Sequence, residues 1–251
     1  MAKYVDANDL SNNPATRVPI CICLDLSGSM NTVESGEIKQ TGRQEYIDGK
    51  LYNIVEGGTS RLDELQKGLE LLFKSIKEDD MAVDAAEVAI VSFADDAKKE
   101  MDFDHIENQE LPLLEANGDK TAIGSGVILA LQILEERKNL YKEAGVQYFQ
   151  PWLVLMTDGE NNKNQNALAE AIKKTEELTK GKKLSIFAIG IGKDADMEIL
   201  AKLSPKRRPL RLQGIKFPEF FEWLSQSIAR VSVSKTGEDV KLPPIDDWGT
   251  L

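Results

Sequence analysis

The chain has 251 residues, of which 41% are hydrophobic and 29% charged, and its formal net charge is -11. That apolar content is enough for a sizeable core and excludes a globally disordered chain, while the negative charge disfavours binding to nucleic acid. One histidine and two cysteines exclude histidine-rich zinc sites, Cys₂His₂ fingers and a disulfide framework. Because residues 1–6 contain no apolar leader and no run approaches 18 apolar residues, we expect a soluble, cytoplasmic protein without a membrane partner.

Short apolar runs alternate with amphipathic segments from about residue 17 onward. Nearly continuous apolarity is typical of strands that are covered on both faces of a parallel sheet, and it predicts strands at 18–25, 88–93, 152–156 and 184–189. Apolar residues spaced by three and four predict helices over about 60–76, 125–143, 168–178 and 217–231. Ser60 is a predicted N-cap with Asp63 three residues later, and Pro218 suits the first turn of the last helix. The alternation predicts an α/β fold with a doubly wound, mostly parallel central sheet flanked by helices.

We therefore expect one domain over residues 17–234, between an N-terminal extension over 1–16 and a C-terminal tail over 235–251 with an extended end segment. Inside the domain, an insert over about 31–59 is polar and contains several glycines. Asp48-Gly49 lies between β-forming residues in Tyr46–Tyr52 and predicts a β-hairpin there.

Polar side chains of three separate segments are expected at one edge of the sheet. Asp25, Ser27 and Ser29 follow the first strand, and Asp158 follows the strand at 152–156. Thr121 stands just before a helix and supplies a third hydroxyl. Because ligands bind beyond the carboxyl ends of strands in such sheets, these hard oxygens suit Mg²⁺, with Mn²⁺ or Ca²⁺ left open. A capped turn without a metal is the simpler alternative for Asp25, Ser27 and Ser29.

The pattern Asp25-x-Ser27-x-Ser29, then Thr121, then Asp158-Gly resembles the metal-ion-dependent adhesion site of the von Willebrand factor type A (VWA) family. The resemblance covers about residues 17–234. It implies that Ser27, Ser29 and Thr121 are direct ligands, that Asp25 and Asp158 act at or just beyond the coordination shell, and that a partner's Asp or Glu completes it. It also implies a non-enzymatic, cation-dependent protein-binding module.

Two segments, 150–159 and 187–192, are similar to the bacterial TerY/YegL-like subgroup of that family. That similarity implies a stress or tellurite-resistance-type signalling system in which the partner is a kinase or a PP2C-like phosphatase. The departure from the family pattern is the insert at 31–59. We expect it to form a small flap beside the cation that selects partners or partly covers the site, the alternatives being an internal ligand from Glu34, Glu37, Glu45 or Glu56, or a surface insertion without a role.

Other functions are less well supported. A Mg²⁺-dependent phosphohydrolase with Asp25 as nucleophile is the alternative, but Ser27 stands where such enzymes keep a second acid, and there is no P-loop. Gly190-Ile-Gly192 mimics a dinucleotide fingerprint but follows a late strand. Cys21 and Cys23 are expected to be buried as small apolar residues.

Overall fold

The predicted apolar strands form the centre of a seven-stranded sheet in the computed structural model, which describes residues 10, 13–47, 50–212, 214, 216–235, 240–245 and 249–250. The strands lie in the order β5-β4-β1-β6-β7-β8-β9, and neighbours from β4 to β8 are parallel. The two edge strands are antiparallel to their neighbours. The sheet strands are β1 Val18–Asp25, β4 Ala86–Phe93, β5 Ala97–Met101, β6 Trp152–Thr157, β7 Ser185–Ile191, β8 Leu210–Leu212 and β9 Gly249–Thr250.

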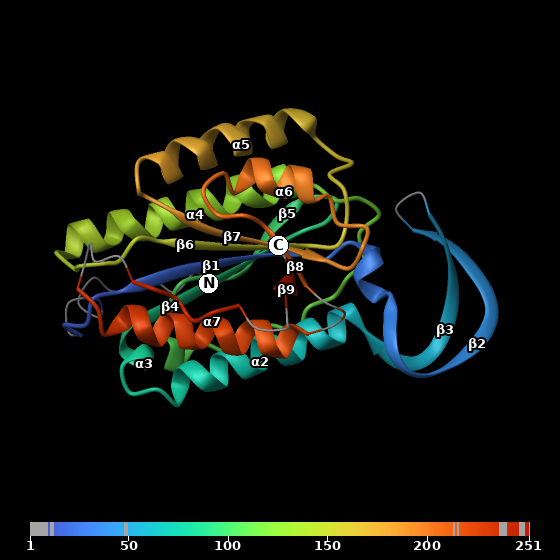
Figure 1. The fold of residues 1–251 in the computed structure, drawn as a ribbon, viewed down its shortest axis with the longest axis horizontal. Coiled ribbons are helices and arrows are strands. Elements are labelled where there is room, and N and C mark those ends of the chain that lie inside the picture. Colours follow the sequence, from blue (N-terminus) through green and yellow to red (C-terminus); the bar gives the residue numbers. More distant parts are fainter. Residues whose placement is uncertain are drawn as a thin grey trace, which may run out of the picture.

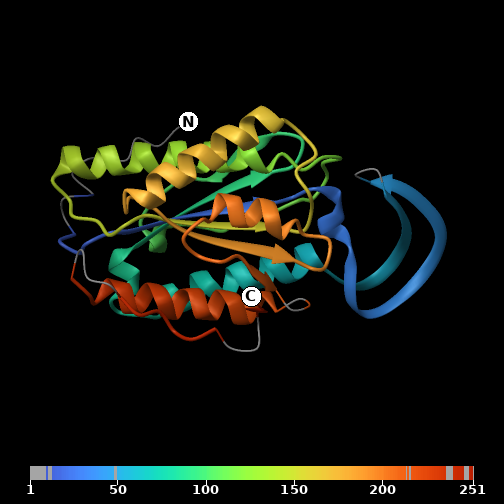
Figure 2. The same cartoon turned by 45° about the horizontal axis from the view of Figure 1, so that its top comes forward.

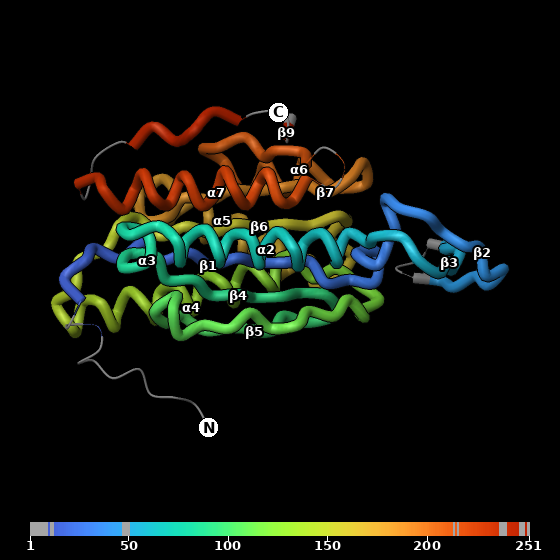
Figure 3. Tube along the Cα trace, turned by 90° about the horizontal axis from the view of Figure 1, so that it is seen from below, coloured from blue at the N-terminus to red at the C-terminus, as the bar shows by residue number. Residues whose placement is uncertain are grey.

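Helices cover both faces of the sheet (Figures 1 and 2). One layer holds α4, α5 and α6, and the other holds α2, α3 and α7. Seen from the α2 and α7 side, these two helices lie side by side and run along the strands (Figure 3). The helices are α2 Arg61–Lys77, α3 Ala82–Ala85, α4 Ile123–Ala144, α5 Gln165–Lys180, α6 Met197–Leu203 and α7 Phe217–Ser232, with 3-10 turns η1 Gly28–Asn31 and η2 Ile106–Asn108. The α/β class predicted from the sequence is confirmed.

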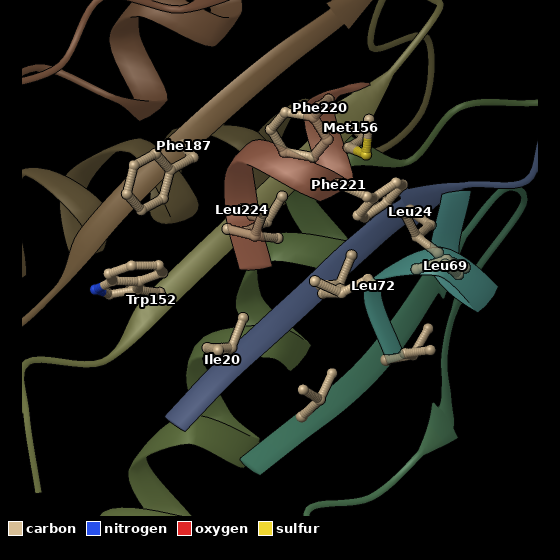
Figure 4. Packing of buried hydrophobic residues seen from close by; sticks show 14 of the residues in the cluster. Ile20, Leu24, Leu69, Leu72, Trp152, Met156, Phe187, Phe220, Phe221 and Leu224 are labelled. Atoms are coloured by element: carbon tan, nitrogen blue, oxygen red, sulfur yellow. The ribbon is translucent and has the colours of Figure 1, made fainter. Parts of the chain in front are cut away.

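Side chains of β1 alternate between two cores, although the strand is apolar throughout. Ile20 and Leu24 point to the layer of α2 and α7, and Leu24 lies beside Phe221 there (Figure 4). Cys21 and Cys23 point to the layer of α4 and α5, and both are buried, as predicted. Burial raises the pKa of each thiol above its usual value, which keeps both cysteines protonated and unreactive.

Predicted helix ends are also confirmed. Ser60 caps α2 through its Oγ, which accepts from the amide of Asp63 at 3.1 Å, while Asp63 accepts from the Ser60 amide at 2.8 Å. This reciprocal arrangement fixes where the helix begins, at Arg61. Pro218 lies in the first turn of α7. No helix among the described residues is both long enough and apolar enough to cross a membrane.

The insert is a two-stranded antiparallel ribbon, much longer than the hairpin predicted at Tyr46–Tyr52. Its strands are β2 Val33–Ile47 and β3 Lys50–Ser60, and they form a sheet of their own. The ribbon extends away from the body at the end of the main sheet (Figures 1 and 3). Three register shifts interrupt the ladder, and glycines at positive φ accompany them. The predicted Asp48-Gly49 turn lies outside the described residues.

Candidate metal centre

The carboxyl end of β1 positions Asp25 at the centre of the sheet edge. Its Oδ1 accepts a hydrogen bond from the amide of Ser27 at 2.9 Å, and its Oδ2 accepts from Thr157 Oγ1 at 2.5 Å. The side chain is buried, with 1% of the residue exposed. Because β1 has β4 on one side and β6 on the other, Asp25 lies where the strand order reverses, which is where ligands bind in such sheets.

The turn after β1 directs two hydroxyls toward Asp158, the residue that follows β6. Ser27 Oγ and Ser29 Oγ are 3.0 Å apart, and Ser29 Oγ donates to Asp158 Oδ1 at 2.7 Å. Ser27 and Asp158 are almost fully buried, and Ser29 is 8% exposed. Four of the five predicted residues are therefore linked in one hydrogen-bonded cluster.

Thr121 reaches the cluster from the loop before α4. A Cβ built on Gly159 would lie 3.3 Å from Thr121 Oγ1, so the threonine hydroxyl faces the turn that carries Asp158. The loop is held on both sides, since Asn162 Oδ1 accepts from the Thr121 amide at 2.9 Å and the Gly28 amide donates to the Gly118 carbonyl at 2.7 Å. The structure thus brings all five predicted residues to one place. Their ligation of a cation stays a prediction.

Two site residues escaped the sequence analysis. Thr157 is the hydroxyl donor to Asp25, and its place at the end of β6, directly before Asp158, was the available signal. Arg61, the first residue of α2, donates from Nη1 to Asp158 Oδ2 at 2.7 Å. Nothing in the local sequence indicates this contact, because the partners are 97 residues apart.

Negative charge exceeds positive charge in the cluster. Burial and, next, the neighbouring Asp158 carboxylate raise the pKa of Asp25 to about 7, although hydrogen bonds from Thr157 and Ser27 oppose the rise. Arg61 is the basic residue paired with Asp158 in the described part of the chain. Two buried carboxylates with one guanidinium form a site whose field favours an added cation.

The donor set fits a hard divalent cation. Ligand oxygens around octahedral Mg²⁺, at about 2.1 Å from the ion, lie about 3.0 Å from their neighbours, and the Ser27 and Ser29 hydroxyls have that spacing. Within the described residues, no group of three or more His, Cys, Asp or Glu side chains could hold a metal. The site instead combines two carboxylates with three hydroxyls, which suits Mg²⁺ because this ion takes few protein carboxylates and keeps several waters.

The proposed internal carboxylate ligands from the insert lie elsewhere. Glu34 accepts from Arg61 Nε at 2.7 Å instead of entering the hydroxyl cluster, and Glu37, Glu45 and Glu56 are exposed. The ribbon contacts the site through Glu34 and Arg61 and is therefore anchored beside it. Its expected roles, selecting partners or partly covering the site, stay predictions.

Solved structures share the fold at low sequence identity. Proximal thread matrix protein 1 from the mussel byssus matches with a TM-score of 0.53 and 17% identity over 86% of this chain and 47% of that chain. One structure of it has a zinc-occupied MIDAS motif. This chain spans about half the length of the mussel protein.

Two bacterial structures match similarly. BatB from Bacteroides thetaiotaomicron has a TM-score of 0.52 and 17% identity over 86% of this chain and 100% of that chain. A von Willebrand factor type A protein from Catenulispora acidiphila has a TM-score of 0.52 and 15% identity over 86% of this chain and 43% of that chain. At these identities the likeness concerns the fold alone.

A family model for the von Willebrand factor type A domain matches residues 53–216. The match begins within β3, so it contains Thr121 and Asp158, whereas the turn after β1 precedes it. No curated protein sequence matched the chain. On the family match, together with the fold, the chain belongs to the von Willebrand factor type A domain family.

Proposed function

We propose that this chain is a non-enzymatic module that binds a partner protein through a divalent cation held at the carboxyl edge of the sheet. VWA domains generally mediate protein–protein interactions. The observation that carries the proposal is the convergence of two buried carboxylates and three hydroxyls from three segments of the chain. Hard oxygens gathered in this way are the ligands that divalent cations such as Mg²⁺ prefer.

Ser27, Ser29 and Thr121 would hold the cation directly, and Asp25 and Asp158 would support it, in part through water. Mg²⁺ fits the donors, and Mn²⁺ or Ca²⁺ shares their oxygen chemistry. The neutral hydroxyls leave the bound ion electrophilic toward an incoming carboxylate. We therefore propose that an Asp or Glu of the partner completes the coordination.

We further propose that the chain belongs to the TerY/YegL-like subgroup and serves a bacterial stress or tellurite-resistance-type signalling system. The support is the similarity of residues 150–159 and 187–192, which form β6 with its site turn and the end of β7. A kinase or a PP2C-like phosphatase is the partner this implies. Purification of the tagged protein from its host with Mg²⁺, and again with EDTA, tests this directly.

The phosphohydrolase alternative has less support from the geometry of Asp25. Both of its carboxylate oxygens accept hydrogen bonds, and its side chain is buried. A nucleophile needs a free oxygen aimed at the substrate. An assay with a generic aryl phosphate and Mg²⁺ distinguishes the two functions, because turnover that disappears in Asp25→Asn would favour the enzyme.

Calorimetric titration of the EDTA-treated protein tests the metal site. We expect one Mg²⁺ per chain in the wild type and a loss of affinity of at least about tenfold in Asp158→Ala. The matched control is Glu160→Gln, which alters an exposed acid two residues away. Equal Mg²⁺ affinity in wild type and Asp158→Ala contradicts the assignment. For a confirmed partner, full-strength binding by Ser29→Ala in EDTA contradicts the cation-dependent contact.

A further inference from the structure

Arg61 connects the base of the ribbon to the candidate metal centre. Its Nη1 donates to Asp158 Oδ2 at 2.7 Å, while its Nε and Nη2 lie 2.7 and 2.5 Å from Glu34 Oε1. The arginine side chain is 9% exposed and that of Asp158 is fully buried. One guanidinium thus spans two carboxylates that belong to different parts of the fold: the site turn after β6 and the first residues of β2.

The two contacts of the guanidinium are not equivalent. Asp158 has a second hydrogen-bond donor, Ser29, on its other oxygen, and belongs to a cluster that we propose binds a cation. Glu34 is 33% exposed and lies outside that cluster. Because Arg61 uses different nitrogens for the two acids, the contact with Asp158 can break while the contact with Glu34 remains.

A divalent cation and Arg61 compete for the same carboxylate. Each positive charge near Asp158 weakens the attraction of that carboxylate for the other, and the two positive charges repel each other. In the described residues, Arg61 is the basic side chain paired with Asp158, so removing its charge leaves the two site acids without that compensation. Arg61 therefore opposes cation binding electrostatically.

We propose that Arg61 is a positioning residue that the divalent cation displaces from Asp158. This displacement couples occupancy of the site to the base of the β2–β3 ribbon. When the cation binds, Nη1 leaves Asp158, and the guanidinium stays on Glu34. The base of the ribbon, where β3 continues into Arg61 of α2, then loses its ionic link to the turn after β6 and becomes looser. This inference rests on the cation site proposed above, and by linkage whatever tightens the ribbon base weakens cation affinity.

Cation affinity separates this role from a merely structural one. In Arg61→Gln we expect Mg²⁺ affinity to rise about tenfold, because a competitor is removed. A structural role predicts the reverse, since a loosened site binds less well. The matched control is Lys67→Gln, which removes an exposed positive charge from the same helix and is expected to leave the affinity unchanged.

Glu34→Gln provides a second variant that is expected to fold, because the glutamate side chain is 33% exposed. Without Glu34, Arg61 has Asp158 as its remaining carboxylate partner among the described residues, so we expect Mg²⁺ affinity to fall about threefold. Glu37→Gln changes the ribbon charge equally, away from Arg61, and should match the wild type. The predicted order of affinity is Arg61→Gln, then wild type, then Glu34→Gln.

Amide hydrogen exchange with and without saturating Mg²⁺ measures the local stability of the ribbon base, which is a readout separate from Mg²⁺ affinity. We expect exchange at the base of the ribbon, where Val33 pairs with Ser60 and Ser35 with Thr59, to accelerate at least about threefold with Mg²⁺ in the wild type. Arg61→Lys keeps the charge but lacks the forked geometry that reaches both acids, so it should keep an affinity near that of the wild type and lose the Mg²⁺ effect on exchange.

The outcomes separate this inference from the proposed function. If the wild type binds no Mg²⁺, both are wrong. If the wild type binds Mg²⁺ but Arg61→Gln binds it equally or more weakly, the displacement of Arg61 from Asp158 is overturned and the metal site stands. The same holds if Mg²⁺ slows hydrogen exchange at the ribbon base or has no effect on it.

Discussion

Two buried charged clusters lie at opposite ends of the parallel sheet, and their charge balance differs. At the amino end, Glu87 of β4 lies 3.2 Å from Arg17 Nε and 2.6 Å from Arg137 Nε, and it accepts a hydrogen bond from Tyr141. At the carboxyl end, Arg61 pairs with Asp158, and the Asp158 carboxylate in turn helps to raise the pKa of Asp25. The first cluster has more cations than acids, and the second has more acids than cations.

The side chains of the amino-end cluster have further partners around them. Arg17 also donates to the carbonyls of Ala15 and Asp84, each at 2.9 Å, and Arg137 lies over the ring of Tyr141. Burial and the Glu87 carboxylate raise the pKa of Tyr141 well above its usual value, which keeps the phenol a donor. A buried acid paired with two guanidinium groups holds the fold together, whereas two buried acids with one guanidinium between them are suited to a cation.

The largest expected effect comes from removing the acid of the amino-end cluster. Glu87→Gln leaves two buried guanidinium groups without their carboxylate, and we expect the free energy of unfolding to fall by about 3 kcal/mol or more. Urea denaturation measures this, with Glu143→Gln on the exposed side of α4 as the control, expected within about 0.5 kcal/mol of wild type. A loss below about 1 kcal/mol would show that Glu87 is not the centre of that cluster.

The cluster at the carboxyl end should respond in the opposite direction when the charge of Asp25 is removed. Because the pKa of Asp25 is raised to about 7 from 3.8, the folded chain holds this proton more tightly than the unfolded chain. Its stabilising contribution is fully present below the ordinary value of 3.8 and is lost as the pH rises through about 7. In EDTA at about pH 8, Asp25→Asn should therefore raise the free energy of unfolding by about 1–3 kcal/mol, while it weakens Mg²⁺ binding.

The same variant gives a pH signature. The difference in stability between Asp25→Asn and wild type should grow as the pH is raised from about 4 to about 8, whereas Asp119→Asn, which alters an exposed acid in a neighbouring loop, should show no such trend. Parallel pH profiles for wild type and Asp25→Asn would mean that Asp25 is not held in an unfavourable environment.

A smaller effect tests the hydroxyls. Thr121→Val keeps the shape of a fully buried side chain and removes one oxygen from the site, so Mg²⁺ affinity should fall about tenfold. Thr175→Val is the control, because that buried hydroxyl bonds a carbonyl of its own helix, 2.9 Å away at Ile172. Calorimetry measures the Mg²⁺ affinity of both variants and of the wild type. Equal affinity in Thr121→Val and wild type would show that Thr121 is not a ligand.

The smallest effect on the fold is expected from shortening the ribbon. Replacing residues 37–56 with a short Gly/Ser linker keeps Glu34 and should change the free energy of unfolding by less than about 1 kcal/mol, since the ribbon forms a sheet of its own. Mg²⁺ affinity should stay within about threefold, while affinity for a confirmed partner falls. Unchanged partner affinity would leave the ribbon without a role in binding.

The buried parts of the fold could be predicted from the sequence, because the local residue pattern and the tertiary environment agree there. The continuous apolarity of Val18–Asp25 reflects cover on both faces. Asp25 and Asp158 were found from where strands end, and Thr121 from where a helix begins. Edge strands gave no such signal: Ala97–Met101 is largely exposed and polar, since one side of it has no neighbour. The contact of Arg61 with Asp158 could not be predicted, because it depends on how a helix start and a strand end meet across the fold.

The irregular ladder of the ribbon has a further consequence, for solubility. Strands of 15 and 11 residues in a two-stranded sheet expose two long edges, which are templates for intermolecular pairing and aggregation. Gly57 and Gly58 have φ of 80° and 79°, and a Cβ on Gly58 would come within 2.4 Å of Val33 Cγ1. The bulges beside them divide the edges into short stretches that another strand cannot follow. The ribbon can therefore project into solvent, available to one partner, without joining copies of the chain into fibrils.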